Sequence, residues 1–445
     1  MRTRTHDTSE YGVQYVSGLL RLAEKRNIAH ISRQTGVESQ NMQQFISDSP
    51  WSGPGLIGAV QAKIGQHPVW DTGAVLVIDE SAAEKAGQTS VGASRQHNGR
   101  LGKVDVCQVG VFAALVTPEV NSWIDGELFI PEKWFAPEAA AKRKRLGVPA
   151  ERTFQTKPQL AWQIIQRAQA NGMPFVAVDM DDLYGRNREL CAQLDQAGLE
   201  YYGDIPANTV VYLARPPIEW PLTRRDKQSK RYRIVSDQRY EVRQLLHWDK
   251  LEWVRLTLRP CERGDLVAAF ARCRVWLVDK AGRPYQRWLL IRRQDKQVTY
   301  VLSNAAEETS LETMAWRKSH RYFIERSHQD AKSELGWAEF QAIKYRAWEH
   351  HLALTILASW FIADTRLDWM ARHQRDPDLL ARFETDVLPL LSVGNVRELF
   401  DAALPLPQFS PEEATALVIE HLINRIRSRN SRLRKQRLRE RVPET

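Results

Sequence analysis

The chain has 445 residues, which is too long for one simple hydrophobic core and suggests roughly two to four folded units. Its content of 43% hydrophobic and 26% charged residues is typical of a globular protein and excludes a disordered chain. The net charge of +9 favours a polyanionic partner. The four cysteines form no C-x-x-C pair, which argues against a zinc site and fits a reducing cytosol. No apolar run is long enough to cross a bilayer, so we expect no membrane partner.

Helical signals dominate residues 1–70. Residues 15–25 are amphipathic, and residues 28–36 and 40–47 predict two short helices separated by a turn at Gly36, with Ser39 as the N-cap. This arrangement resembles a helix-turn-helix, although an ordinary pair of antiparallel helices fits the same residues equally well. We interpret residues 1–70 as a helical N-terminal DNA-binding region.

From residue 71 the hydrophobic pattern changes to that of strands. Residues 75–78 are a continuous apolar run, as expected for a buried central strand, and this run ends on Asp79. Residues 104–116 and 121–130 predict two further strands that pair antiparallel across a short turn. Residues 87–102 are rich in Gly, Ser, Gln and Arg and predict a long exposed loop.

The next elements alternate between helix and strand. Residues 157–171 and 187–197 predict helices, and residues 175–178 and 199–202 predict strands. The resulting β-β-β-α-β-α-β order is one that RNase H-like proteins use. The fold class predicted is therefore α/β, with a mixed sheet flanked by helices, and residues 71–204 form the first part of an RNase H-like core.

Residues 205–303 contain several short strand candidates separated by polar turns and predict a β-rich insertion into that core. A basic loop at residues 223–233 would contact DNA phosphates; its candidate residues are Arg224, Arg225, Lys230 and Arg231. The insertion also holds tryptophans available for stacking on an exposed base, although packing is the commoner role for each; these are Trp248, Trp253, Trp276 and Trp288.

A charged helix follows the insertion. Arg321, Glu325 and Gln329 recur at i, i+4 and i+8 on one face, with Lys332 close beside them. Residues 345–365 are mostly apolar and predict a helix buried against the sheet, in which His350 and His351 are structural. We interpret residues 304–370 as the closing helices of the core.

Residues 371–445 are predicted to form a helical C-terminal region that ends in a basic tail. Residues 425–441 carry nine Lys and Arg against one Glu. A solvated tail is the ordinary interpretation of such a run, but so dense a positive charge is most simply a phosphate-binding arm.

Three acidic positions suggest a metal site. Asp79 follows one apolar strand, Asp179 and Asp181 follow another, and Glu325 lies on a later helix. Glu325 alone would be a partner in an i,i+4 ion pair. Two strand-end carboxylates and one on a late helix are, however, the way in which an RNase H-like core gathers ligands for two metal ions. Carboxylate oxygens favour Mg²⁺, with Mn²⁺ as a substitute, over zinc.

Three blocks resemble the DDE transposases of bacterial insertion sequences, in the branch named for insertion sequence 701, which is related to the insertion sequence 4 group. The first block is VLVIDES at 75–81, with SVGASRQH at 90–97 and VCQVGVF at 106–112. The second is DDLYG at 181–185, with YGDIPAN at 202–208. The third is IERSHQDAKSELG at 324–336, with HHLALT at 350–355. These blocks span most of the chain.

The resemblance implies that the catalytic and metal-binding acids are Asp79, Asp181 and Glu325. Asp179, at the predicted strand end, is a rival for the second position, and Asp182 is a weaker one. The insertion sequence 4 group carries a Tyr, Arg, Glu, Lys signature around its Glu. Arg321, Glu325 and Lys332 fit its spacing, but Lys318 stands where Tyr is expected. Arg321 and Lys332 would pair with DNA phosphate or position Glu325.

The function that the resemblance implies is that of an active transposase. It would bind the terminal inverted repeats of double-stranded DNA, cut there with two Mg²⁺ ions and transfer the strand to target DNA. It would act as a homodimer, because two ends must be synapsed, in the bacterial cytoplasm at the nucleoid. The alternatives are a catalytically idle DNA-binding protein of transposase descent and an RNase H-like nuclease without strand transfer. The intact acidic set favours the active enzyme.

Overall fold

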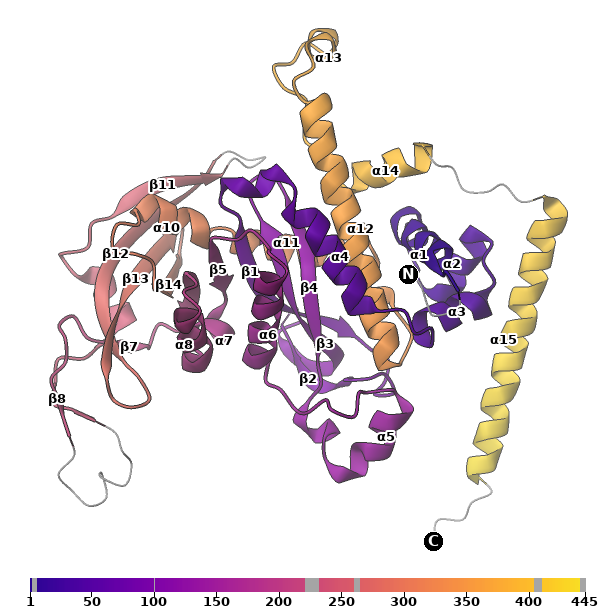
Figure 1. The fold of residues 1–445 in the computed structure, drawn as a ribbon, viewed down its shortest axis with the longest axis horizontal. Helices are drawn as coiled ribbons and strands as arrows, with labels where there is room; N and C mark the ends of the chain where they lie inside the picture. The colour runs from indigo at the N-terminus through magenta and orange to yellow at the C-terminus, as the bar shows by residue number, and fades with distance from the viewer. Residues whose placement is uncertain (2–5, 100, 221–231, 260–264, 404–409, 441–445) are drawn as a thin grey trace.

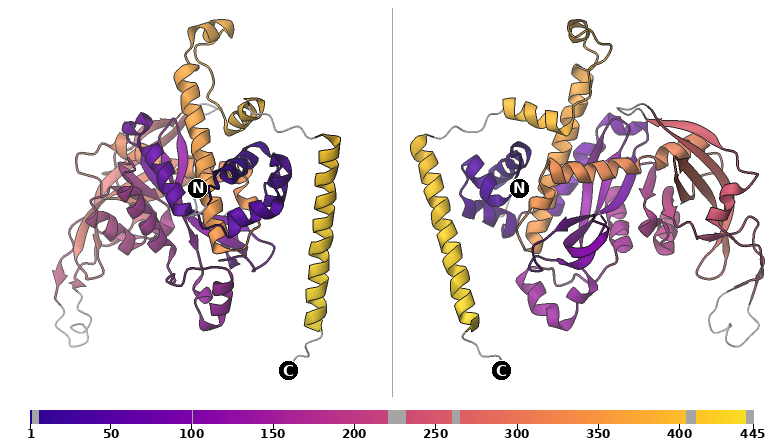
Figure 2. Two further views of the ribbon diagram at one scale, coloured as in Figure 1. Left: turned by 45° about the vertical axis from the view of Figure 1, so that its right-hand side comes forward. Right: turned by 180° about the vertical axis from the view of Figure 1, so that it is seen from behind.

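In the computed structural model, the described residues are 1, 6–99, 101–220, 232–259, 265–403 and 410–440. Within them, ten strands form one mixed sheet in the order β11-β12-β13-β14-β6-β5-β1-β3-β2, and β4 also pairs with β3 (Figure 1). Helices cover both faces of this sheet (Figures 1 and 2). In the described part of the chain, no helix has both the length and the apolar character that crossing a membrane requires.

The strands of the large sheet are β1 (Val75–Glu84), β2 (Ser94–Asn98), β3 (Lys103–Val116), β4 (Asn121–Phe129), β5 (Ala177–Met180), β6 (Tyr201–Ile205), β11 (Val254–Arg259), β12 (Leu266–Val278), β13 (Pro284–Gln294) and β14 (Gln297–Ser303). Four short strands form two separate pairs: β7 (Val210–Val211) with β10 (Tyr240–Glu241), and β8 (Ile218–Glu219) with β9 (Arg233–Ile234).

The α-helices are α1 (Ser9–Arg21), α2 (Ile28–Thr35), α3 (Ser39–Ser47), α4 (Gly53–Gly65), α5 (Ala140–Arg145), α6 (Lys157–Ala170), α7 (Asp182–Gly185), α8 (Arg188–Gln196), α10 (Leu311–Lys318), α11 (Arg321–Ser333), α12 (Tyr345–Arg372), α13 (Pro377–Arg382), α14 (Val393–Ala403) and α15 (Pro411–Glu440). Short 3₁₀ turns are η1 (Pro68–Thr72), η2 (Glu132–Trp134), η3 (Pro137–Ala139), η4 (Val242–His247) and η5 (Trp337–Glu339).

The centre of the sheet confirms the predicted fold class. β1 pairs in parallel with β5, and β5 pairs in parallel with β6, whereas β3 is antiparallel to both β1 and β4. Residues 74–78 and 111–116 are fully buried, as expected for strands that are covered on both faces. α6 and α8 lie on one face and α10 and α11 on the other (Figures 1 and 2). This is the mixed sheet with flanking helices of an RNase H-like core.

Three details of the predicted strands were wrong. The segment 87–102 is not simply an exposed loop, because it contains β2, which pairs with the start of β3. The polar sequence of this segment gave no sign of the strand, although Val91 and Ala93, just before β2, are buried. β1 does not end at Asp79 but continues to Glu84, because β3 pairs with its whole length. β5 and β6 both begin two residues later than predicted.

The strands β11–β14 continue the central sheet. β14 pairs antiparallel with β6, which would otherwise be the edge of the core. An uncovered edge strand exposes unpaired backbone groups, so this pairing protects β6. One face of the added strands packs on α10 through residues such as Phe270, Leu290 and Met314. The four basic loop candidates, Arg224, Arg225, Lys230 and Arg231, lie outside the described residues.

The N-terminal helices pack against α12. The turn after α2 forms at Gly36, whose φ of 71° is in the left-handed region that glycine favours. Glu38, rather than Ser39, is the N-cap of α3, and it makes no side-chain cap hydrogen bond. His350 lies 2.9 Å from the carbonyl oxygens of both Ile46 and Trp51, and so ties α12 to the N-terminal region.

Candidate functional site

The register of two parallel strands places Asp79 beside Asp181. β1 and β5 pair from Val75 with Ala177 to Ile78 with Met180, and there the pairing ends. Asp79 directly follows Ile78 in β1, and Asp181 directly follows Met180, the last residue of β5. Their proximity has an electrostatic effect, since the charge of Asp181 contributes to a raised pKa at Asp79.

Asp79 is a largely buried carboxylate with one fixed oxygen. Its side chain is 12% exposed, and its Oδ1 accepts a hydrogen bond from the backbone N–H of Glu80 at 2.8 Å. Side chains alternate along β1, so Asp79 lies on the face covered by α11, whereas Glu80 pairs with Lys157 of α6 at 2.6 Å. Burial and the charge of Asp181 raise the pKa of Asp79 to about 7, although Arg321 opposes the shift.

Asp181 is held at the start of a short helix. It is the N-cap of α7, and its Oδ1 accepts hydrogen bonds from the backbone N–H groups of Leu183 at 2.9 Å and Tyr184 at 3.3 Å. Burial raises its pKa, and Arg321 partly opposes that shift. Each of the two aspartates therefore has one oxygen fixed by backbone amides.

The cap is positioned by a close contact between two glycines. A Cβ atom on Gly203 of β6 would lie 2.6 Å from the Cα of Gly185, the last residue of α7. Neither backbone can move away freely, because α7 begins at the end of β5 and β6 is paired on both sides. The absence of a side chain at Gly203 therefore sets where Asp181 lies.

We expect Gly203→Ala to destabilise the protein by about 1–3 kcal/mol, because the added methyl group overlaps the backbone of α7. Urea unfolding of the purified variant measures this change. Gly58→Ala is the matched control, because a Cβ there meets no atom within 4 Å. A Gly203→Ala protein as stable as wild type would show that the glycine contact does not constrain α7.

Asp179 is engaged elsewhere. It lies within β5 rather than at its end, is completely buried, and its Oδ1 lies 2.5 Å from Nζ of Lys318. Burial lowers the pKa of Lys318, but the charges of Asp179 and Asp204 outweigh this effect and raise it above its ordinary value. The structure therefore places Asp179 in a buried ion pair, and Lys318, where the related signature has Tyr, is its partner.

Glu325 lies on the exposed side of α11. Its side chain is 60% exposed, and Oε1 lies 3.8 Å from Nη2 of Arg321. Arg321 also donates from Nη1 to Oδ2 of Asp204 at 2.7 Å. Among the residues that the structure describes, no group of three or more His, Cys, Asp or Glu side chains is close enough together to hold a metal ion. The fold thus brings Asp79 and Asp181 together, and it connects Glu325 to them through Arg321.

Arg321 is the cation that these acids share. Burial lowers its pKa, but the charges of Asp79, Asp204 and Asp181 outweigh that effect and hold its pKa above the ordinary value. Lys332 lies further along α11 and is half-buried, and its positive charge helps to lower the pKa of His328. The helix therefore carries both positive charges predicted from the sequence.

His328 is a residue of this site that the sequence analysis missed. It lies three residues after Glu325 on α11, and its ring is edge-on to those of Phe112 and Trp123. Nε2 lies 3.8 Å from Oδ2 of Asp79, and neither ring nitrogen has a hydrogen-bond partner among the residues that the structure describes. Burial lowers the pKa of His328 to about 3, so the ring is neutral and brings no charge to Asp79. Its position on the inner face of the charged helix was the only available signal.

The donor chemistry at Asp79 and Asp181 suits a hard divalent cation. Two carboxylates that disfavour each other's charge gain most from a cation bound between them. The hydroxyl of Tyr184 is buried and has no hydrogen-bond partner in the described part of the chain, and the charges of Glu80, Asp181 and Asp79 all act on it. An unpaired buried hydroxyl beside acidic groups is suited to hydrogen bonding with a water on such a cation.

We expect Asp79→Asn to stabilise the metal-free protein by roughly 2 kcal/mol at pH 8, because it removes a buried, repelled charge. In the unfolded chain this carboxyl titrates near 4, and in the folded chain at about 7. Between these values the folded protein retains a proton that the unfolded chain has lost, so wild-type stability falls as the pH rises. The gain should be absent near pH 4 and complete above pH 7.

Chemical denaturation of wild type and Asp79→Asn across this pH range, in the presence of a chelator, measures the difference. A gain that is constant with pH would mean that Asp79 keeps an ordinary pKa in the folded state.

Known proteins resemble this chain in sequence. The sequence model of the family described as DDE superfamily endonuclease matches residues 2–263, more than half of the chain. The match includes Asp79, Asp181 and Asp204, whereas Glu325 lies beyond it. The chain is also 26% identical, over 336 residues, to a protein of Microchaete diplosiphon named probable transposase for insertion sequence element IS701. That alignment covers 72% of this chain and 74% of the relative.

Proposed function

This protein belongs to the DDE superfamily of endonucleases, and we propose that it is a transposase that cuts and joins DNA at the ends of an insertion sequence. Both comparisons confirm the family resemblance that the three sequence blocks suggested. One observation supports the proposal most strongly. The register that ends at Ile78 and Met180 places Asp79 beside Asp181, under a helix that carries Arg321 and Glu325.

Asp79, Asp181 and Glu325 are the residues proposed to hold the divalent metal that DDE endonucleases generally use. Mg²⁺, with Mn²⁺ as a substitute, suits these oxygen ligands, and we propose two ions. When bound, such ions activate the attacking water or 3′-OH and stabilise the leaving oxygen. Asp179 is the weaker candidate, because its carboxylate is already paired with Lys318.

The remaining side chains would orient the acids and exclude water. Backbone amides fix one oxygen of Asp79 and one of Asp181, so the second oxygen of each is presented in a defined direction. The neutral ring of His328 closes the inner side of Asp79 without adding a charge that would compete with a metal. Arg321 would hold Glu325 until DNA arrives, and Arg321 and Lys332 would then contact phosphate.

DNA contacts are proposed over a larger surface. The polar face of α3 presents amide side chains to solvent while its other face packs into the core; the exposed amides are Gln40, Asn41, Gln43 and Gln44. Amides of this kind can pair with base edges in the major groove. The basic run within α15 and the basic segment at residues 223–233, most of which lies outside the described residues, would add phosphate contacts, as the net charge of +9 favours. A dimer at the bacterial nucleoid would bring two terminal repeats together.

A strand-transfer assay tests the proposed function. The protein is incubated with Mg²⁺, a supercoiled target plasmid and a labelled DNA that carries the two ends of its own insertion sequence. The proposal predicts labelled plasmid products whose junctions begin at the terminal nucleotide of the repeat. A duplex of scrambled repeat sequence is the control and should give none.

The same assay separates the alternatives. Cleavage of the repeat without joining would indicate a nuclease of the same fold and would contradict the transfer step. Binding of the repeat without cleavage, with either Mg²⁺ or Mn²⁺, would indicate a DNA-binding protein of transposase descent and would overturn the proposed enzyme.

A further inference from the structure

Asp204 lies between the two cations that flank the start of α11. It is on β6, with its side chain 13% exposed, and its two oxygens contact different partners. Oδ1 lies 3.1 Å from Nζ of Lys318, and Oδ2 accepts a hydrogen bond from Nη1 of Arg321 at 2.7 Å. Lys318 is the last residue of α10 and Arg321 is the first of α11, so one carboxylate contacts both sides of the helix break.

The contacts continue in both directions from Asp204. Beyond Lys318 lies the buried carboxylate of Asp179, and beyond Arg321 lies Glu325. Three acids thus alternate with two cations, from the interior of β5 to the exposed side of α11. Removing Asp204 would leave Lys318 and Arg321 facing each other without the carboxylate that separates them.

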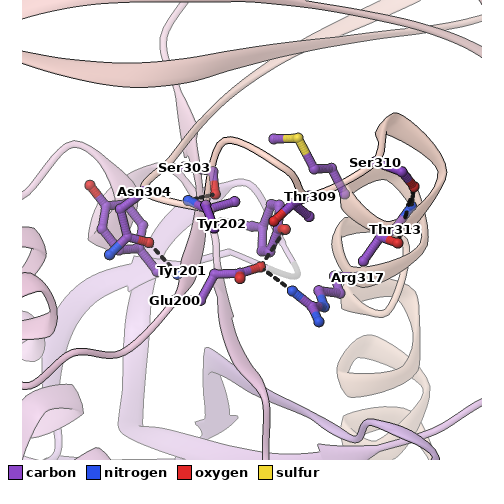
Figure 3. Close-up of polar contacts among 12 residues, drawn as sticks. Glu200, Tyr201, Tyr202, Ser303, Asn304, Thr309, Ser310, Thr313 and Arg317 are labelled. Carbon is purple, nitrogen blue, oxygen red and sulfur yellow. Dashed lines mark hydrogen bonds and ion pairs between the residues drawn. The ribbon is translucent and has the colours of Figure 1, made fainter.

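A second contact fixes the same end of α10 independently. Arg317 donates to Oε1 of Glu200 at 2.5 Å, and the Tyr202 hydroxyl donates to the same oxygen at 2.5 Å, as Figure 3 shows. Glu200 immediately precedes β6, the strand that carries Asp204. The position of α10 therefore does not depend on Asp204 alone. α11 begins after the break, at Arg321, and packs on β1, β3 and β4.

We propose that Asp204 is a positioning residue for the active site, which orients Glu325 by holding Arg321 and offsetting the charge of Lys318. The proposal rests on the proposed function for its catalytic meaning. Arg321 can serve as the link because its planar guanidinium reaches two carboxylates from different nitrogens, which a lysine ammonium at the same position cannot do with the same geometry. Both oxygens of Asp204 face cations of the chain, Lys318 at Oδ1 and Arg321 at Oδ2, which suits a positioning role.

Hydrogen exchange of the metal-free protein tests the positioning role directly. We expect Asp204→Asn and Arg321→Lys to speed amide exchange in the first turns of α11 by about tenfold or more. Glu200→Gln is the matched control, since it removes an ion pair between the same strand region and α10. It should loosen α10 but leave exchange in α11 unchanged. If Asp204→Asn does not fold, Arg321→Lys still tests the contact between Arg321 and Asp204 from its other side.

Calorimetric titration with Mn²⁺ is the second measurement. Loss of a group that orients a metal ligand weakens metal affinity by about tenfold or more, so Asp204→Asn and Arg321→Lys should bind Mn²⁺ correspondingly less tightly than Glu200→Gln. Equal exchange in α11 and equal affinity for Asp204→Asn and Glu200→Gln would overturn the proposal. If wild type itself bound no Mn²⁺, the metal site of the proposed function would fail, and the exchange result would still decide the role of Asp204.

Discussion

Glu325→Gln should reduce DNA cleavage at least about 1,000-fold, equivalent to roughly 4 kcal/mol of transition-state stabilisation, while the fold is preserved. The side chain is 60% exposed, and its carboxylate lies 3.8 Å from the guanidinium of Arg321. An exposed ion pair of this kind contributes about 0–1 kcal/mol, so the free energy of unfolding should hardly change. The measurement pairs a cleavage time course with denaturant unfolding of the same preparation.

Glu307→Gln is the control for this variant, because Glu307 is exposed in the turn before α10 and lies outside the proposed site. It should cut as wild type does. Cleavage by Glu325→Gln within tenfold of wild type would remove Glu325 from the proposed metal site and leave its charge as an ordinary helix-surface feature.

Asp181→Asn and Asp179→Asn should fail in different ways. Asp181 caps α7 through Oδ1, which an amide oxygen can replace, so Asp181→Asn should fold and bind DNA but lose cleavage. Asp179 is one of two carboxylates that pair with the buried Lys318, and Asp204 remains when it is replaced, so Asp179→Asn should lower the free energy of unfolding by about 1–3 kcal/mol. Thermal unfolding and a cleavage assay on both variants provide the comparison.

The double variant Asp179→Asn with Lys318→Met supplies the internal check. It removes both charges of the buried pair, so it should recover part of the stability that Asp179→Asn loses. A stable Asp179→Asn protein that no longer cuts, together with an active Asp181→Asn protein, would exchange the roles that we assign to the two aspartates.

The sequence was sufficient to predict the central strands. The apolar run before Asp79 and the alternation of helix and strand up to residue 204 predicted the order β1, β3, β4, α6, β5, α8 and β6, but not β2, α5 or α7. The run did not reveal where β1 ends. Its continuation to Glu84 depends on β3 alone, whereas its pairing with β5 stops at Ile78. Partner strands, which are distant in sequence, determine that difference.

The ionic contacts of the site were not predictable from local sequence. Asp179 and Asp181 are only two residues apart, and the pattern of apolar residues favoured neither. The distinction arises because Lys318, 139 residues after Asp179, contacts one and not the other. Asp204 belonged to a recognised block, but its role depends on two side chains from different helices. These contacts join β6 to the adjacent ends of α10 and α11, and they can be identified only from the structure.

His328 illustrates a third kind of miss. Its spacing from the apolar residues Ile324 and Ala331 places it on the inner face of the helix, which helical periodicity could have indicated. A histidine on such a face is most often a packed core residue, and nothing in the sequence located Asp79 beneath it. β5 begins two residues later than predicted, because Pro174 and Phe175 precede the strand without pairing within it.

The measurement that tests the central claim most directly is cleavage of a labelled DNA duplex carrying the terminal repeat, by wild type and Asp79→Asn, with Mn²⁺. Our account predicts that wild type cuts at the repeat end. It also predicts that Asp79→Asn binds the duplex equally well, unfolds at no lower denaturant concentration, and does not cut. Cutting by Asp79→Asn at the wild-type rate would contradict the account, because the acid placed beside Asp181 at the end of the β1–β5 pairing would then have no part in the chemistry.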